Sequence, residues 1–181
     1  MITEIAEHSV DLSLLPLKAN ILDIGCRGFW FKDYFTSLNH NVIALDIDEL
    51  PRGDYRKIAI SDVDGFCSMV NTSDPQARHI KTGNDIPMFT LDSLSKLCYI
   101  DKWDLIKIDI EGEEVKVLKS ISHPYCKQIS VEFHAHCGVQ TKEQLDSLLD
   151  WLSEWYTIHN KVWEQRHGCS FNYWDILLIA K

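Results

Sequence analysis

Short apolar runs alternate with amphipathic segments along most of the chain. The apolar runs have the length and continuity of strands that are buried on both faces. They lie at residues 19–25, 41–47, 55–60, 103–110 and 128–136. Apolar residues at helical spacing occur at residues 30–38, 91–97, 113–121 and 142–156. This alternation predicts an α/β fold with a mainly parallel sheet and helices on both of its faces.

Polar segments precede and interrupt these elements. Residues 1–18 form a polar lead-in, with room for one short helix that ends before Pro16. Residues 65–70 predict an extra strand, and the following stretch 71–90 is rich in Asn, Ser, Thr, Asp, Gly and Pro, which is typical of a loop. No internal repeat is present, so the 181 residues are expected to form a single domain.

Two strands without an intervening helix close the chain. Residues 158–165 and 170–180 have strand character, and a turn at His167-Gly168 is expected to join them as an antiparallel pair. Thr141 is the expected N-cap of the helix at 142–156. The domain is thus expected to comprise a core at 19–135, followed by a helix and a hairpin at 136–181.

Composition and charge narrow the class of protein. The 27 acidic residues exceed the 18 basic ones, which gives a formal net charge of -9. This balance repels phosphate backbones and anionic lipid, so neither nucleic acid nor a membrane is an expected partner. The six cysteines are scattered without a CxxC pair, and the N-terminus lacks the positive charge of a signal peptide. We therefore expect a cytoplasmic protein with free thiols; the sequence carries no signal of its oligomeric state.

A glycine-containing turn follows the first predicted strand. Asp23, Gly25, Cys26 and Gly28 lie in the run DIGCRG, directly before a predicted helix. Glycines at such a turn allow the backbone to reverse tightly and a ligand to approach closely. Asp46 ends the next strand, where a carboxylate can accept hydrogen bonds from both ribose hydroxyls of a nucleoside. The turn therefore predicts a nucleoside-containing cofactor.

Two cofactors, NAD and S-adenosylmethionine, share this requirement. The dinucleotide fingerprint G-x-G-x-x-G needs a second glycine where this chain has Arg27. S-adenosylmethionine carries an ammonium and a sulfonium group in place of phosphates, and the acidic Asp23 at the strand tip suits these cations. The turn therefore favours S-adenosylmethionine over NAD. An ordinary glycine-rich turn with a capping aspartate is the alternative without a cofactor.

Acidic residues recur at the ends of the later strands. Ser61 and Asp62 follow the third predicted strand, where a carboxylate can reach the amino group of an adenine. The polar residues that end the fourth and fifth strands are Asp109, Glu111, Glu132 and His134. Because the carboxyl ends of parallel strands share one edge of a sheet, we expect these groups to surround one site.

Taken together, these motifs resemble the FkbM family of S-adenosylmethionine-dependent methyltransferases. The resemblance covers roughly residues 20–135 and consists of the segments DIGCRG, ALDID, IAISDVDG, TLDSL, DLIKIDIEGEEVKVLK and VEFH. It implies a class I methyltransferase, Rossmann-like fold: a seven-stranded, mainly parallel sheet whose last strand is antiparallel. The antiparallel pair that closes this chain favours the same fold. The resemblance also implies methylation of a hydroxyl group on a sugar or a natural product.

The resemblance assigns a role to each matching position. Cofactor binding falls on the glycine turn, on the ribose-binding acid and on the adenine-side pair, namely Asp23, Gly25, Gly28, Asp46, Ser61 and Asp62. The IDIEG motif contributes Asp109 and Glu111, and the VEFH motif contributes Glu132 and His134. The chain departs from the family at Phe29, where many members keep a further glycine. It is also short, with little inserted sequence to cover a small-molecule or glycan acceptor.

Methyl transfer to a hydroxyl requires alignment of the acceptor and removal of its proton. An imidazole has an ordinary pKa of about 6.5, so a neutral His134 can act as the base. We expect His134 or Asp109 in this role, with Glu111 structural or acceptor-binding. A divalent metal held by Asp109, Glu132 and His134 is the alternative, because it would lower the pKa of the hydroxyl.

Two other functions compete with a methyltransferase. One is a non-catalytic module that keeps the fold and binds S-adenosylmethionine or a partner. The other is a small NAD-dependent oxidoreductase, but the chain contains no Tyr-x-x-x-Lys pair that would serve as its proton donor.

Overall fold

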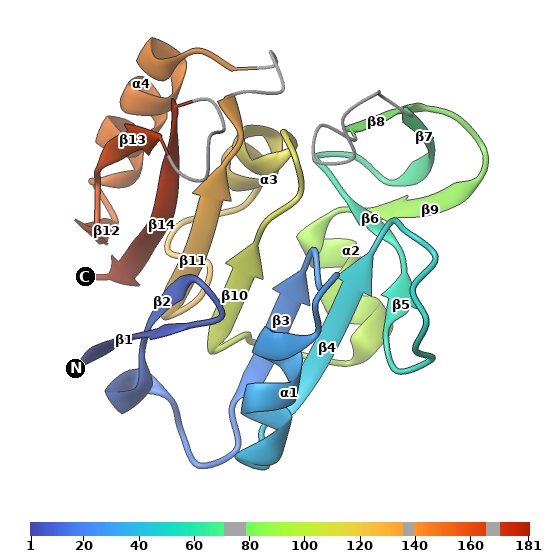
Figure 1. Ribbon diagram of the computed structural model, residues 1–181, viewed down its shortest axis with the longest axis horizontal. Helices are drawn as coiled ribbons and strands as arrows, with labels where there is room; N and C mark the ends of the chain where they lie inside the picture. The colour runs from blue at the N-terminus through green and yellow to red at the C-terminus, as the bar shows by residue number, and fades with distance from the viewer. Residues whose placement is uncertain (71–78, 136–139, 166–170) are drawn as a thin grey trace.

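A mixed sheet forms the centre of the molecule. The computed structural model describes residues 1–70, 79–135, 140–165 and 171–181 (Figure 1). Within these ranges the sheet has eight strands in the order β12-β14-β11-β10-β3-β4-β5, with β13 also paired to β14. The strands are β3 (Asn20–Ile24), β4 (Asn41–Asp46), β5 (Arg56–Lys57), β10 (Leu105–Ile108), β11 (Gln128–Phe133), β12 (Tyr156–His159), β13 (Trp163–Gln165) and β14 (Phe171–Ala180).

The neighbouring strands β11, β10, β3, β4 and β5 run parallel to one another. Strand β14 runs antiparallel to β11, β12 and β13. The predicted α/β class is thus confirmed, but the sheet has eight strands rather than seven. The segment expected as one strand at 158–165 divides because Asn160 adopts a left-handed φ of 60°, which a continuous strand does not allow. The expected turn at His167-Gly168 lies outside the described residues.

A second, smaller sheet is inserted between β5 and α2, where a loop was expected. Its strands are β6 (Ala59–Ile60), β7 (Gly65–Val70), β8 (His79–Thr82) and β9 (Ile86–Phe89), in the order β6-β9-β7-β8. The extra strand predicted at 65–70 is therefore confirmed, and the loop expected over 79–89 is wrong. The strand predicted at 55–60 divides into β5 of the main sheet and β6 of this one. Strands β8 and β9 escape prediction because they are short and lie among polar turn residues, so no long apolar run marks them. Residues 71–78 lie outside the described ranges.

The polar lead-in forms a β-hairpin instead of a helix. Strands β1 (Ile2–Ile5) and β2 (His8–Asp11) pair antiparallel, and a single 3-10 turn follows at Leu12–Leu14. Ala6 and Glu7 make the hairpin turn with φ values of 49° and 67°. Such a turn is normally signalled by Asn or Gly, and neither occurs here.

Polar side chains fasten this hairpin to the sheet. Gln128 on β11 accepts a hydrogen bond from the Asp11 backbone N–H at 2.9 Å and donates one to the Asp11 carbonyl at 3.1 Å. The Ser9 hydroxyl donates to Asp175 on β14 at 2.8 Å. The hairpin is therefore an ordered layer on one face of the sheet.

Four α-helices complete the described part of the chain: α1 (Trp30–Ser37), α2 (Leu91–Cys98), α3 (Glu114–Ser120) and α4 (Lys142–Leu152). Side chains alternate between the two faces of a strand, so neighbouring residues enter different cores. Ile21 packs with Phe31 and Phe35 of α1, whereas Leu22 belongs to the larger core built with α2, α3 and α4. Figure 1 shows α1 and the hairpin together in front of the sheet. None of these helices combines the length and the apolar character that a membrane span requires.

Helix α4 begins at the predicted cap. The Thr141 side chain accepts a hydrogen bond from the Gln144 backbone N–H, and the Gln144 side chain accepts one from the Thr141 N–H, which completes a capping box. Thr141→Ala should lower the free energy of unfolding by about 1 kcal/mol because the Gln144 N–H loses its acceptor, the Thr141 hydroxyl. Chemical denaturation measures the change. Ser147→Ala on the exposed face of the same helix is the control, with an expected change within about 0.5 kcal/mol; equal effects of the two substitutions would contradict the capping role.

Candidate active site

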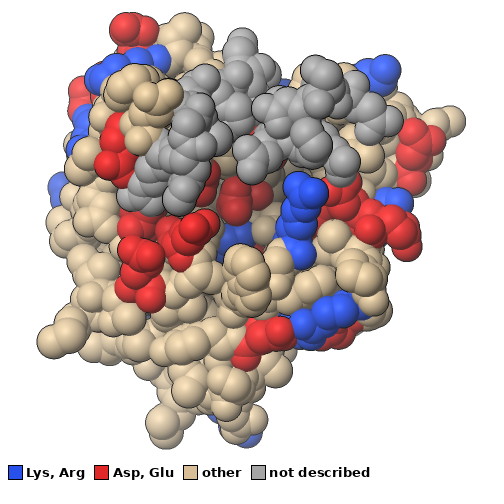
Figure 2. Space-filling model, in the orientation of Figure 1, with Lys and Arg blue, Asp and Glu red and all other residues tan. Residues whose placement is uncertain are grey.

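A pocket opens at the carboxyl ends of β3, β4 and β10. Its empty volume is about 720 Å³, including the open mouth. Ile47, Ile60 and Ile80 contribute apolar walls, and Arg27 contributes a basic group. The acidic residues that line it are Asp46, Asp48, Asp109, Glu111 and Glu113. Figure 2 shows acidic side chains gathered around a hollow in the middle of this face. The predicted meeting of acidic strand ends at one edge is thus observed for β4 and β10.

The turn after β3 lies directly against the end of β10. Gly25 has a φ of +82°, and its N–H donates a hydrogen bond to the Leu45 carbonyl at 2.9 Å. A Cβ at this position would overlap the backbone carbonyl of Asp109. Only glycine therefore permits both the turn and the close approach that places Asp109 in the same pocket.

The other predicted residues of this turn lie away from the pocket lining. Cys26 is buried against Phe29 and Ala44, and burial raises the pKa of its thiol to about 12. Gly28 is exposed. Phe29, the departure from the family pattern, adopts a left-handed φ of 58°, and its ring lies 4.3 Å from the Arg52 guanidinium. Cys26 and Gly28 are thus not part of the pocket lining, and their predicted contact with a cofactor stays a prediction.

Asp46 stands where the sequence predicted a ribose-binding acid. It is largely buried at the end of β4, it lines the pocket, and it accepts a hydrogen bond from the Asp48 N–H at 2.9 Å. Burial raises the pKa of its carboxyl group above the ordinary value. By contrast, Ser61 donates a hydrogen bond to Glu113 at 2.6 Å, and Asp62 is exposed. Ser61 thus orients an acid of the pocket, and the adenine-side role of the pair stays a prediction.

A buried lysine lies beneath the acidic rim. Lys107 Nζ is 3.2 Å from Asp23 Oδ1 and 3.3 Å from Asp109 Oδ2, and it donates a hydrogen bond to the Gly25 carbonyl at 2.7 Å. Burial would lower the pKa of Lys107, but the two aspartates outweigh burial and raise it above its usual range. Asp23 is fully buried, so it faces this lysine instead of the expected cofactor cation. The available signal was a lysine within an apolar strand, two residues before Asp109 and hence on the same face.

His134 lies just beyond β11 within a group of carboxylates. Its Nδ1 is 2.6 Å from Glu114 Oε1, and its Nε2 is 3.3 Å from Glu132 Oε1 and 3.5 Å from Asp109 Oδ1. Burial alone would lower the pKa of His134, but these carboxylates outweigh burial and raise it well above the ordinary value. Both ring nitrogens thus face acidic oxygens, and the role of base expected for His134 or Asp109 stays a prediction. Glu111, which lines the pocket, is also near, at 3.7 Å from Nε2.

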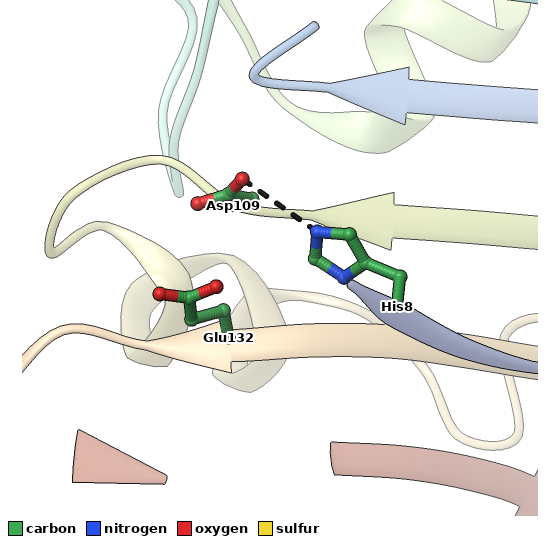
Figure 3. A group of neighbouring side chains, drawn as sticks. All are labelled: His8, Asp109 and Glu132. Carbon is green, nitrogen blue, oxygen red and sulfur yellow. Dashed lines mark ion pairs between the residues drawn. The ribbon is translucent and has the colours of Figure 1, made fainter. Parts of the chain in front are cut away.

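Asp109 and Glu132 do come together, with a third residue that the sequence did not indicate. His8 on β2 lies beside them (Figure 3), and its Nε2 is 3.6 Å from Asp109 Oδ2. In the described part of the chain, one ligand atom from each of His8, Asp109 and Glu132 lies within 4.8 Å of the others. His8 thus joins Asp109 and Glu132 in a candidate metal-binding group, and the group predicted with His134, whose Nε2 also faces both carboxylates, stays a prediction. Nothing in the polar lead-in signalled His8, because its position depends on the unpredicted hairpin.

Comparison with known proteins identifies the domain. The model of the methyltransferase FkbM domain matches residues 22–160. No curated protein and no solved structure matches the chain significantly. The matched range includes the turn after β3, the acidic ends of β4 and β10, and His134, but not the hairpin that carries His8. The chain belongs to the FkbM methyltransferase family.

Proposed function

We propose that the protein transfers a methyl group from S-adenosylmethionine to a hydroxyl group of a small-molecule or glycan acceptor. The observation that carries this proposal is the charge of the pocket, where the charged lining among the described residues is five carboxylates and one arginine. Such a lining attracts a sulfonium and an ammonium group and repels a pyrophosphate. NAD is therefore the less suitable ligand.

The order of the strands supports the same proposal. The chain leaves β3 toward β4 and β5 on one side, and later returns to β10 and β11 on the other. The pocket lies at the carboxyl ends of β3 and β10, where this strand order reverses, and open α/β sheets bind nucleosides at such a point. This arrangement favours a class I, Rossmann-like methyltransferase sheet with β13 as an addition.

The residues present fit the cofactor. S-adenosylmethionine supplies a methyl group already activated by a positively charged sulfur. Asp46 would accept hydrogen bonds from the ribose hydroxyls, and Ile60 and Ile80 would contact the adenine. Asp109 and Glu111 would face the positive charges from the end of β10. Gly25 keeps the turn after β3 close enough for these groups to share one pocket.

On the acceptor side, we assign the proton-accepting role to Asp109. It lines the pocket and is partly exposed, whereas His134 is buried with both ring nitrogens toward carboxylates. Asp109 accepts a hydrogen bond from the acceptor hydroxyl and takes its proton as the oxygen gains the methyl group. Lys107 and His134 hold this carboxylate in position from either side. Both are positioning residues in this mechanism.

The described cysteines support the expected compartment. Cys26, Cys67, Cys98 and Cys126 are all free thiols. A reducing environment keeps thiols in this state, so we retain the cytoplasm as the proposed location.

Calorimetric titration with S-adenosylmethionine and NAD tests the cofactor assignment. The protein should bind S-adenosylmethionine, and Asp46→Asn should weaken binding at least tenfold, about 1.4 kcal/mol, because a charge-assisted pair of ribose hydrogen bonds is lost. Asp101→Asn, at an exposed position away from the pocket lining, is the control and should leave the affinity unchanged. Binding of NAD in preference to S-adenosylmethionine would overturn the proposal.

A methyl-transfer assay against sugars, nucleotide sugars and small phenols tests the reaction and narrows the acceptor class. Asp109→Asn should lower turnover at least a hundredfold, because general base catalysis contributes about 10²–10⁴ in rate. Cofactor binding without turnover on any acceptor would instead favour the non-catalytic module.

A further inference from the structure

We propose that His8, Asp109 and Glu132 form a binding site for a divalent metal ion beside the cofactor pocket. We further infer that the bound ion takes the acceptor hydroxyl as a ligand. The catalytic part of this inference rests on the proposed function, whereas the binding of the ion does not.

The three side chains converge from different parts of the fold. His8 lies on the hairpin strand β2, Asp109 directly follows β10, and Glu132 lies on β11 (Figure 3). Their ligand atoms lie within 4.8 Å of one another. Ligands about 2.0–2.2 Å from a common ion lie about 3–4 Å apart, so a small inward movement completes the site. An imidazole with two carboxylates suits a first-row transition ion such as Mn²⁺, Fe²⁺ or Zn²⁺.

The His8 ring is buried and oriented for this role. Its side chain is 3% exposed, and its Nδ1 is 3.4 Å from the Ser130 hydroxyl. The other ring nitrogen, Nε2, is directed at Asp109, whose Oδ2 is 3.6 Å away. Metal-binding histidines typically use their second nitrogen for such an orienting hydrogen bond. The Ser130 contact thus holds the ring with Nε2 turned toward Asp109 (Figure 3).

The charges around the site favour an added cation. Three basic side chains, Lys107, His134 and His8, contact four carboxylates. These are Asp23, Asp109, Glu114 and Glu132. Asp23 and Glu114 are fully buried, and the other two are mostly buried. Acidic groups therefore outnumber basic groups in a poorly solvated region, where a carboxylate without a partner is costly. A bound cation would supply a partner for this excess of carboxylates.

The hairpin holds the imidazole rigidly. Ser9 and Asp11 follow His8 on β2, and they form hydrogen bonds with Asp175 and Gln128 of the sheet. A ligand on such a fastened strand is preorganised, which lowers the free-energy cost of forming the site. Because the family match begins at residue 22, this ligand is a contribution of the segment that precedes the matched domain.

The ion would activate the acceptor. A divalent metal lowers the pKa of a bound hydroxyl and fixes the position of its oxygen. Asp109 Oδ2 faces His8, whereas Oδ1 faces His134, so the ligand atom and the proton acceptor are different atoms. The hydroxyl loses its proton to Oδ1, its oxygen bonds to the methyl carbon, and the carbon–sulfur electron pair stays on sulfur.

Titration of chelator-treated protein with Mn²⁺, followed by electron paramagnetic resonance of the free ion, tests the site without any cofactor or acceptor. We expect one saturable site per chain. His8→Ala and Glu132→Gln should each weaken Mn²⁺ binding at least tenfold, and His159→Ala on the edge strand β12 should not. Thermal melting checks that each variant is folded, and the isosteric Glu132→Gln remains informative if His8→Ala unfolds. Absence of saturable binding to the unmodified chain, or equal binding by the folded variants, would overturn the inference.

A second measurement separates this inference from the proposed function. Calorimetry with S-adenosylmethionine in the presence of a chelator should still show binding, because the metal ligands apart from Asp109 lie outside the pocket lining. Methyl transfer should fall at least tenfold in chelator and recover with Mn²⁺. Cofactor binding with full activity in chelator would overturn the role of the ion alone. Absence of cofactor binding, with Mn²⁺ binding intact, would overturn the proposed function and the catalytic part of the inference that rests on it. The metal site itself would stand.

Discussion

Gly25→Ala is expected to lower the free energy of unfolding by about 2–4 kcal/mol and to abolish measurable binding of S-adenosylmethionine. Two costs add at this position. An L-residue in the left-handed region costs about 1–2 kcal/mol. In addition, the new Cβ would overlap the carbonyl of Asp109, and backbone atoms cannot yield as a flexible side chain can. The ends of β3 and β10 must therefore separate, which moves Asp109 away from the turn.

Thermal melting and calorimetric titration measure the two effects of Gly25→Ala. The expected stability change corresponds to a melting temperature lower by about 5–15 °C for a chain of this size. Gly53→Ala is the matched control, because a Cβ there would meet no atom within 4 Å. It should change stability by less than about 0.5 kcal/mol and leave cofactor binding intact. A stable Gly25→Ala protein with unchanged affinity would show that this turn does not shape the pocket.

The sequence indicates the central strands well because burial on both faces requires apolar residues at every position. ANILDIG and DLIKIDI each produce a strand of the main sheet, in the expected parallel arrangement. The glycine turn after β3 is also found as predicted, since its φ demands glycine. Elements whose stability comes from local apolar pattern are thus predictable from the chain alone.

The N-terminal hairpin was missed for a different physical reason. The turn at Ala6 and Glu7 has no residue that favours a left-handed φ, and β2 contains the polar residues His8 and Ser9 in buried positions. Their burial is compensated by partners more than a hundred residues away, such as Asp175. Such long-range compensation leaves no mark in the local pattern, so His8 was absent from the predicted site.

The surroundings of Asp23 escape prediction from the strand ends, because they depend on Lys107 in the interior of a neighbouring strand. Acidic tips at Asp23 and Asp109 suggested two groups directed toward a ligand. The structure places Lys107 between them, with Asp23 fully buried. Of these two aspartates, only Asp109 lines the pocket, and Lys107 Nζ lies 3.3 Å from its Oδ2.

Lys107→Met should accordingly produce the largest loss of stability among single charge removals in this site, about 3–5 kcal/mol. Methionine matches the length of the buried stem, so the packing is largely kept, while Asp23 is left as a buried carboxylate with no other charged partner among the described residues and no hydrogen bond. The Gly25 carbonyl also loses its hydrogen bond from Nζ. Burying a charge without a partner costs far more than the net gain from a pair, which is why the effect is expected to be large.

Urea denaturation of Lys107→Met, alone and combined with Asp23→Asn, tests whether uncompensated charge causes the loss. If it does, the double variant should be more stable than Lys107→Met by about 1–3 kcal/mol, because the orphaned carboxylate is removed. Lys57→Met is the control, since Lys57 pairs with Glu49 at 3.0 Å on the surface, where such pairs contribute about 0–1 kcal/mol. A Lys107→Met effect no larger than that of Lys57→Met would mean that solvent reaches Asp23 and Asp109. These two carboxylates would then not depend on the buried lysine for compensation of their charge.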